Sequence, residues 1–226
     1  MAVSGLWDWL ADSVHFYRRH FMAIALMVLP FAIPFAAIQS MYVQNLPEES
    51  AVNYWMFVGL GLLMQPIYQG AIILYMRSHI KQQPWSISRC FEAALSIWPS
   101  LFLVIAMTFS LVMLGLSFFV LPGIVIASRL IVADLHCVLH RTTPLQAISA
   151  SWKQTEEYKW PLLAGVIIVA GVTMIPVWGV HRWLLAQQAS ELLVFSNRVL
   201  GQILEAFFLV FAYRAYSAMN SESEAS

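Results

Sequence analysis

An apolar run from residue 99 to residue 139 constrains this chain more than any other feature of its sequence. A helix needs roughly 20 apolar residues to cross the hydrocarbon core of a bilayer, so a run of this length fits two crossings. The Pro122-Gly123 pair supplies the break between them. We therefore predict one membrane span at about 99–118 and a second at about 121–139.

The composition extends this interpretation to the whole chain. Of the 226 residues, 60% are apolar and 11% are charged, whereas roughly a quarter are charged in ordinary soluble domains. The formal net charge is +0, so no basic field suggests a nucleic-acid partner. We predict an all-α polytopic membrane protein, with residues 1–216 as a single domain and six spans at about 21–43, 54–76, 99–118, 121–139, 161–180 and 193–213.

Three amphipathic segments, at about 6–20, 85–97 and 144–157, alternate with these spans. In the first, apolar residues fall on one side of a helix and charged residues on the other, which favours a helix lying on the membrane surface. The alternative is a first helix that packs on the rest of the protein. In the third, Thr142 or Thr143 can cap a helix that begins at Pro144. The apolar residues of the first segment are Leu6, Trp9, Leu10, Val14, Phe16 and Tyr17.

Lys and Arg residues concentrate on one side of the predicted spans. Nine lie on the side that carries the amphipathic segments, and two, Arg182 and Arg198, lie on the other. Because cytoplasmic loops are enriched in these residues, we predict that both termini are cytoplasmic. The acidic tail, residues 217–226, is predicted to be disordered.

The order of amphipathic segment, outgoing span and returning span occurs three times, at 6–80, 84–140 and 144–216. Trp98-Pro99 and Trp160-Pro161 take the same place in the last two units. Either the chain contains a true internal duplication, as transport folds often do, or its cytoplasmic linkers are simply amphipathic.

The returning spans contain the intramembrane polar residues. A charge at the centre of a bilayer costs at least roughly 2.5–3.5 kcal/mol, so we expect these helices to face the interior of the bundle. We predict that Arg129 contacts Glu205 or Asp134. Three interpretations stay open: a buried pair that fixes helix packing, a path for a polar substrate or proton, and side chains that reach back to the membrane surface. The candidate residues are Gln65, Gln69, Arg129, Asp134, Arg198, Gln202 and Glu205.

Asp134, His136 and His140 form a D-x-H-x-x-x-H pattern. Two histidines four residues apart on a helix can share a metal ion, although membrane enzymes of that kind need several such boxes. The remaining histidines on that side of the membrane are isolated, so we predict interfacial histidines, with no metal and no cofactor. No nucleophile or phosphate-binding motif is evident, and we predict a protein that is not an enzyme.

Several segments resemble a known family. DSVHFYRRHFMAI, FVLPGIVIASRLIVADLHCVL with the following PLQAISASWKQT, and FLVFAYRAYSAM are similar to the uncharacterised YciC-like inner-membrane proteins of Gram-negative bacteria. More loosely, they resemble the membrane domain fused to some glycerophosphodiester phosphodiesterases. The resemblance implies a six-helix protein of the bacterial inner membrane with links to envelope integrity, and it brings no catalytic residues.

Two functions are compatible with the sequence. The first is a non-enzymatic inner-membrane protein that maintains the envelope or membrane through interfacial helices. Its expected partners are membrane lipids, with other inner-membrane proteins as further candidates, because amphipathic helices bind through apolar area and lipid charge. The alternative is a small-molecule or lipid transporter, with a polar path through the second, fourth and sixth spans.

Overall fold

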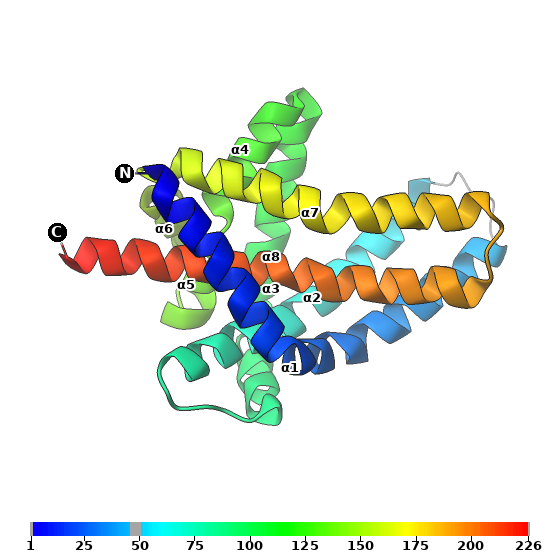
Figure 1. Cartoon of the computed structure of the whole chain (residues 1–226), viewed down its shortest axis with the longest axis horizontal. Helices are drawn as coiled ribbons and strands as arrows, with labels where there is room; N and C mark the ends of the chain where they lie inside the picture. Colours follow the sequence, from blue (N-terminus) through cyan, green and yellow to red (C-terminus); the bar gives the residue numbers. More distant parts are fainter. Residues whose placement is uncertain (1, 46–50, 226) are drawn as a thin grey trace.

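A computed structural model describes residues 2–45 and 51–225 of the chain (Figure 1). Six helical stretches within these ranges are long and apolar enough to cross a membrane. The prediction of an all-α protein with six such helices is confirmed. The elements described in these ranges are α1 (Ala2–Asn45), α2 (Ala51–Ile80), α3 (Ile87–Phe118), α4 (Val120–Leu130), α5 (Ala133–His140), α6 (Pro144–Gln154), α7 (Lys159–Ala186) and α8 (Glu191–Ala225).

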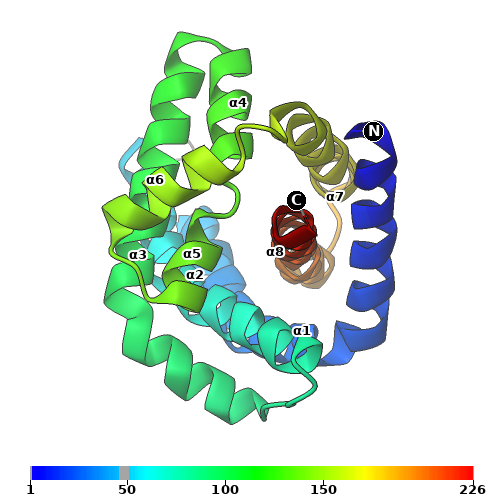
Figure 2. The same cartoon turned by 90° about the vertical axis from the view of Figure 1, so that its left-hand side faces the viewer.

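The helices do not form one parallel bundle. α7 and α8 lie side by side along the long axis of the molecule, whereas α3 and α4 form a hairpin that runs across this axis (Figure 1). Viewed along the long axis, α8 lies in the middle of the other helices (Figure 2). Val210, Phe211, Ala212 and Ala215 on α8 are almost completely buried, so this helix forms the centre of the core.

A glycine allows α7 to approach this central helix closely. A Cβ atom at Gly165 would overlap the ring of Phe211 and would also contact Leu6 of α1 at 3.1 Å. Any larger residue at position 165 must therefore push α7, α8 or α1 apart, because packed interiors leave little room for extra atoms.

The first half of α1 packs on the protein. Leu6, Trp9, Phe16 and Tyr17 are buried, and the Tyr17 hydroxyl donates a 2.7 Å hydrogen bond to the carbonyl oxygen of Ile203 on α8. Four of the six residues that the sequence assigned to a membrane-facing stripe thus pack on the protein, as in the alternative considered above, whereas Val14 is exposed. The segments 6–20 and 21–43 also form one continuous helix.

The predicted segments 85–97 and 99–118 are likewise joined, within α3. The backbone N–H of Arg89 donates to the Ser86 hydroxyl, which caps the start of this helix. Pro99 lies inside the helix without ending it, as membrane helices tolerate where neighbours satisfy the freed groups. The first two repeat-like units therefore contain a fused helix, whereas α6 and α7 of the third unit are separate.

The predicted span at 121–139 is divided into α4 and α5 by a turn at 131–132. α6 provides the physical reason, because the Ser151 and Thr155 hydroxyls donate to the Arg129 carbonyl oxygen at 2.8 and 3.0 Å. This carbonyl is thus satisfied from outside its own helix. α6 itself begins at Pro144, as predicted, and the Thr143 N–H donates to the Gln146 side chain at 3.2 Å.

The prediction of a disordered tail from residue 217 is wrong for residues 217–225, because α8 continues to Ala225. Met219 is almost completely buried, and the Gln154 side chain donates a 2.7 Å hydrogen bond to Asn220. The last turns of α8 are therefore held by packing and by a hydrogen bond to α6. Residue 226 lies outside the described residues.

Candidate binding cavity

A cavity of about 300 Å³ lies between α2, α3, α4, α5, α7 and α8. Its walls are mostly apolar, with residues such as Ile105, Phe109, Leu130 and Phe208. Apolar walls with a few converging polar groups are typical of binding sites for small molecules. The polar side chains that line this cavity are Gln65, Tyr68, Gln69, Thr108, Asp134 and Glu205.

The spacing of residues on α2 and α8 brings these polar groups together. Gln65 and Gln69 are four residues apart on α2 and so share one face of the helix. On α8, Arg198, Gln202 and Glu205 follow at intervals of four and three residues, which also places them on one face. Each helix therefore presents a polar stripe to the interior.

Two further cavities adjoin the first and share lining residues with it. One, of about 300 Å³, is lined by Gln65, Arg198, Gln202 and Glu205 among others. The other, of about 780 Å³, reaches His181 near the end of α7 and is also lined by Arg198 and Glu205. Glu205 lines all three cavities. The cavities thus form a polar series from His181, past Glu205, to Asp134.

Several polar groups of the first cavity lack a partner in the protein. The Oε1 atom of Gln69 and the Oγ1 atom of Thr108 are buried and accept no hydrogen bond from any described residue. Within the same part of the chain, Asp134 and Glu205 form neither a hydrogen bond nor an ion pair with other residues. Burying a polar atom without a partner is costly, so the two buried oxygen atoms of Gln69 and Thr108 that face the cavity indicate a ligand site.

The predicted contact of Arg129 with Glu205 or Asp134 is wrong. Arg129 is buried, and its Nη2 atom donates a 2.6 Å hydrogen bond to the carbonyl oxygen of Trp152 on α6. The physical reason is the turn between α4 and α5, which separates Arg129 from the straight helix on which the prediction depended. Arg129 therefore does not line the first cavity.

The two histidines of the D-x-H-x-x-x-H pattern have partners in the protein. His136 Nε2 donates to the Gln154 side chain at 2.7 Å, and His140 Nε2 lies 2.7 Å from the Tyr216 hydroxyl. Within the described residues, no three His, Cys, Asp or Glu side chains gather as metal ligands. His136 and His140 thus join α5 to α6 and α8.

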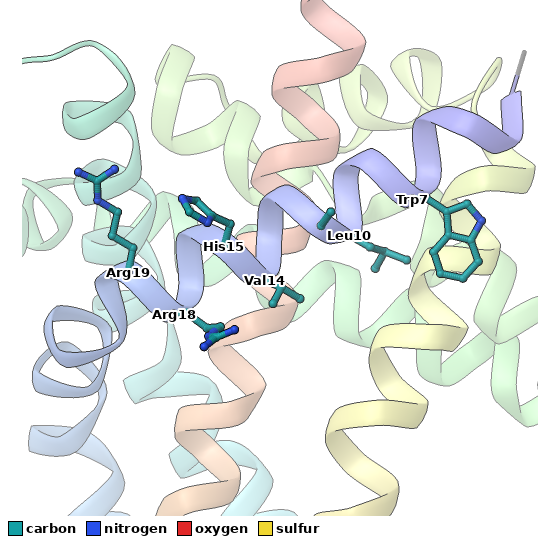
Figure 3. A pocket seen from close by; sticks show the side chains of 7 residues that line it. Trp7, Leu10, Val14, His15, Arg18 and Arg19 are labelled. Carbon is teal, nitrogen blue, oxygen red and sulfur yellow. The ribbon is translucent and has the colours of Figure 1, made fainter.

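A separate hollow of about 1030 Å³ lies on the outer surface of α1. Figure 3 shows Trp7, Leu10, Val14 and Arg18 following one another along this helix, with His15 and Arg19 beside them. Trp7 is 61% exposed. Because the other apolar residues of this segment are buried against the protein, this face is the part of the segment that remains accessible.

Together, the fold and the cavities define a multi-pass membrane protein, all-helical in its described residues, with a polar interior. The model of the family described as "Uncharacterised protein family (UPF0259)" matches residues 51–218. The chain therefore belongs to this family, in agreement with the resemblance to an uncharacterised membrane family. No solved structure matches the chain.

Sequence reasoning identified six residues that the structure brings to these cavities: Gln65, Gln69, Asp134, Arg198, Gln202 and Glu205. Among the polar residues that line the first cavity, it missed Tyr68 and Thr108. Tyr68 is three residues from Gln65, on the same face of α2, so the helical period could have revealed it. Thr108 is one weakly polar residue in the otherwise apolar part of α3, and no sequence signal distinguishes it.

Proposed function

We propose that this protein is a carrier, embedded in the membrane, that binds a small molecule or a lipid in the cavities around Glu205. The single observation that carries this proposal is the position of Glu205, an exposed carboxyl that lines three adjoining cavities on the central helix. A carboxyl of this kind is expensive to keep within a membrane unless it has a function or a partner.

The polar series from His181 to Asp134 supports movement of a ligand as well as its binding. The series follows one face of α8, and α2 and α7 supply the opposite walls. A ligand could exchange its contacts with Arg198, Gln202 and Glu205 in succession. Such a path needs no covalent chemistry, and we propose no enzymatic step.

Native mass spectrometry of the full chain, purified in nanodiscs, tests this proposal. We expect the wild type to retain a molecule of defined mass, and Glu205→Gln to lose it. Glu92→Gln is the matched control, because Glu92 is an exposed residue of α3 outside these cavities. Equal retention by the wild type and Glu205→Gln, or no retained molecule at all, would contradict the carrier proposal.

A second function is favoured by the surface. Leu145 at the start of α6 and Trp160 at the start of α7 are each 70% exposed. Exposed Trp and Leu side chains near the end of a membrane helix are suited to the lipid interface. We propose, as the alternative, a non-enzymatic protein of the bacterial inner membrane that has both termini in the cytoplasm and maintains the envelope by contacting lipids and neighbouring proteins.

The two functions depend on different residues, so one cellular experiment separates them. Cells that carry only a variant protein are compared for their sensitivity to detergent. Sensitivity that rises with Leu145→Glu and not with Glu205→Gln supports the role in the envelope. The reverse pattern supports the carrier, in which the cavity matters and the exposed face of α6 does not.

A further inference from the structure

Four of the polar side chains that line the first cavity, Gln69, Thr108, Asp134 and Glu205, can accept hydrogen bonds from a ligand. Ionised carboxylates accept and do not donate, and a carboxamide oxygen only accepts. When ionised, Asp134 and Glu205 are acceptors, as is the buried Oε1 atom of Gln69, and the Thr108 hydroxyl can act as one. A ligand that satisfies this set must bring hydrogen-bond donors.

The cavity also lacks a compensating positive charge. None of its described lining residues is Lys or Arg. Arg129 is directed toward α6, as described above, and Arg198, which lines the adjoining cavities, donates to the Ser40 hydroxyl at 3.1 Å. Two carboxyls without a cation favour a ligand that carries positive charge, since an unpaired charge within a membrane is unfavourable.

The remaining lining residues of the first cavity favour a ligand with an apolar group. Leu62, Ile105, Val112 and Met174 line the cavity, and the aromatic rings of Phe109 and Phe208 complete it. Such a surface favours hydrocarbon over a strongly hydrated ligand, because burial of apolar area drives the association. A small hydrated metal ion would leave these apolar walls unused.

On these grounds, and resting on the proposed carrier function, we propose that the first cavity binds a protonated primary amine attached to an apolar group. The ammonium pairs with the carboxyls of Asp134 and Glu205, and its three N–H groups are shared among these carboxyls, Gln69 and Thr108. A quaternary ammonium carries the same charge and has no N–H, so it leaves these two acceptors unsatisfied. The amine belongs either to the head group of a membrane lipid or to a free lipophilic amine.

Binding of three probes of similar length to the purified full chain tests the proposal. The probes are hexylamine, hexyltrimethylammonium and hexanol, and the protein is held in nanodiscs of phosphatidylcholine at pH 7. We expect hexylamine to bind at least about tenfold more tightly than either comparison probe, because hydrogen bonds to charged groups are among the strongest. Equal binding of hexanol or of the quaternary probe would overturn the proposal.

Variants locate the binding site. We expect Asp134→Asn and Glu205→Gln each to weaken hexylamine binding about tenfold or more, and Glu92→Gln to leave it unchanged. Thr108→Val keeps both carboxyls and should reduce the preference for hexylamine over the quaternary probe, which a nonspecific attraction of charges would not do. Circular dichroism shows whether each variant is folded. Unchanged binding in folded Glu205→Gln would also overturn the proposal.

A competition experiment identifies the source of the amine. If phosphatidylethanolamine added to the nanodiscs displaces hexylamine, the ligand is a lipid head group. If it does not, the ligand is a free amine, and both results leave the chemical class intact. If the wild type retains a native molecule but does not bind hexylamine, the amine proposal is contradicted and the carrier function is supported. If the protein binds hexylamine but retains no native molecule, the carrier function is contradicted and the amine proposal is supported.

Discussion

Arg129 on α4 donates a 2.6 Å hydrogen bond to the carbonyl oxygen of Trp152 on α6, and its guanidinium carbon lies 4.7 Å from the centre of the Trp152 ring. Its Nη2 atom also lies 3.9 Å from Glu156 Oε2. The most deeply buried arginine of this region thus joins two helices. Arg129 therefore does not pair with the carboxyls of the first cavity, Asp134 and Glu205.

Arg129→Lys should destabilise the protein and spare ligand binding. Lysine keeps the charge but lacks the planar group that both donates to Trp152 and stacks on its ring. We expect a loss of about 1–3 kcal/mol in the free energy of unfolding, measured by denaturant titration in detergent. Glu156→Gln should cost less than about 0.5 kcal/mol, because Glu156 is 70% exposed. If Arg129→Lys weakens hexylamine binding as much as Glu205→Gln does, Arg129 belongs to the site.

The turn between α4 and α5 depends on two hydroxyls that share one acceptor. Ser151→Ala and Thr155→Val each remove one donor from the Arg129 carbonyl oxygen and should each cost about 1 kcal/mol of unfolding free energy. The double variant should cost more than the sum of the two, because only it leaves this carbonyl unpaired. Simple additivity in the same denaturant titrations would show that another group satisfies the carbonyl.

Gly165→Ala should destabilise the protein by about 1–3 kcal/mol, because the added methyl group overlaps the Phe211 ring. Gly179→Ala is a control on the same helix, since a Cβ atom there meets nothing within 4 Å. Its effect should be neutral or stabilising, as expected for alanine in a helix. Thermal unfolding of both variants provides the comparison, and equal effects would mean that α7 and α8 are not in close contact at Gly165.

The carrier proposal predicts that Thr108→Cys reacts with a charged, membrane-impermeant thiol reagent added from either side of a proteoliposome. The native cysteines Cys90 and Cys137 are almost completely buried and should stay unlabelled. Leu103→Cys, on the exposed side of α3, is the control. It should react slowly because hydrocarbon excludes the reagent. Labelling of Thr108→Cys from one side only would indicate a binding site without a path across the membrane.

The six apolar spans could be predicted because hydropathy and proline placement are local signals. The start of α6 at Pro144 is an example of such a signal. The points at which neighbouring helices join or break could not be predicted. α1 stays continuous because its first half covers α8, and α4 ends where α6 supplies hydroxyl donors to Arg129. These are contacts between distant segments, as is the crossing of the α3–α4 hairpin over the long axis (Figure 1).

The candidate cavity was partly predictable for a related reason. Gln65, Asp134 and Glu205 are conspicuous in apolar surroundings, so their side chains could be identified without a structure. The partner of Arg129 could not be identified. The choice of Trp152 by Arg129 depends on where α6 lies, and that position is fixed by packing between helices.

The most direct test of the central claim is the unfolding free energy of Glu205→Gln after bound ligand has been removed. A carboxyl kept for a ligand has no protein partner, so neutralising it should leave the stability unchanged or raise it, as at many functional sites. A carboxyl that fixes helix packing has a partner, and its removal should cost about 3 kcal/mol or more. We expect the first result together with weaker ligand binding. A large loss of stability would contradict the assignment of Glu205 to a binding site.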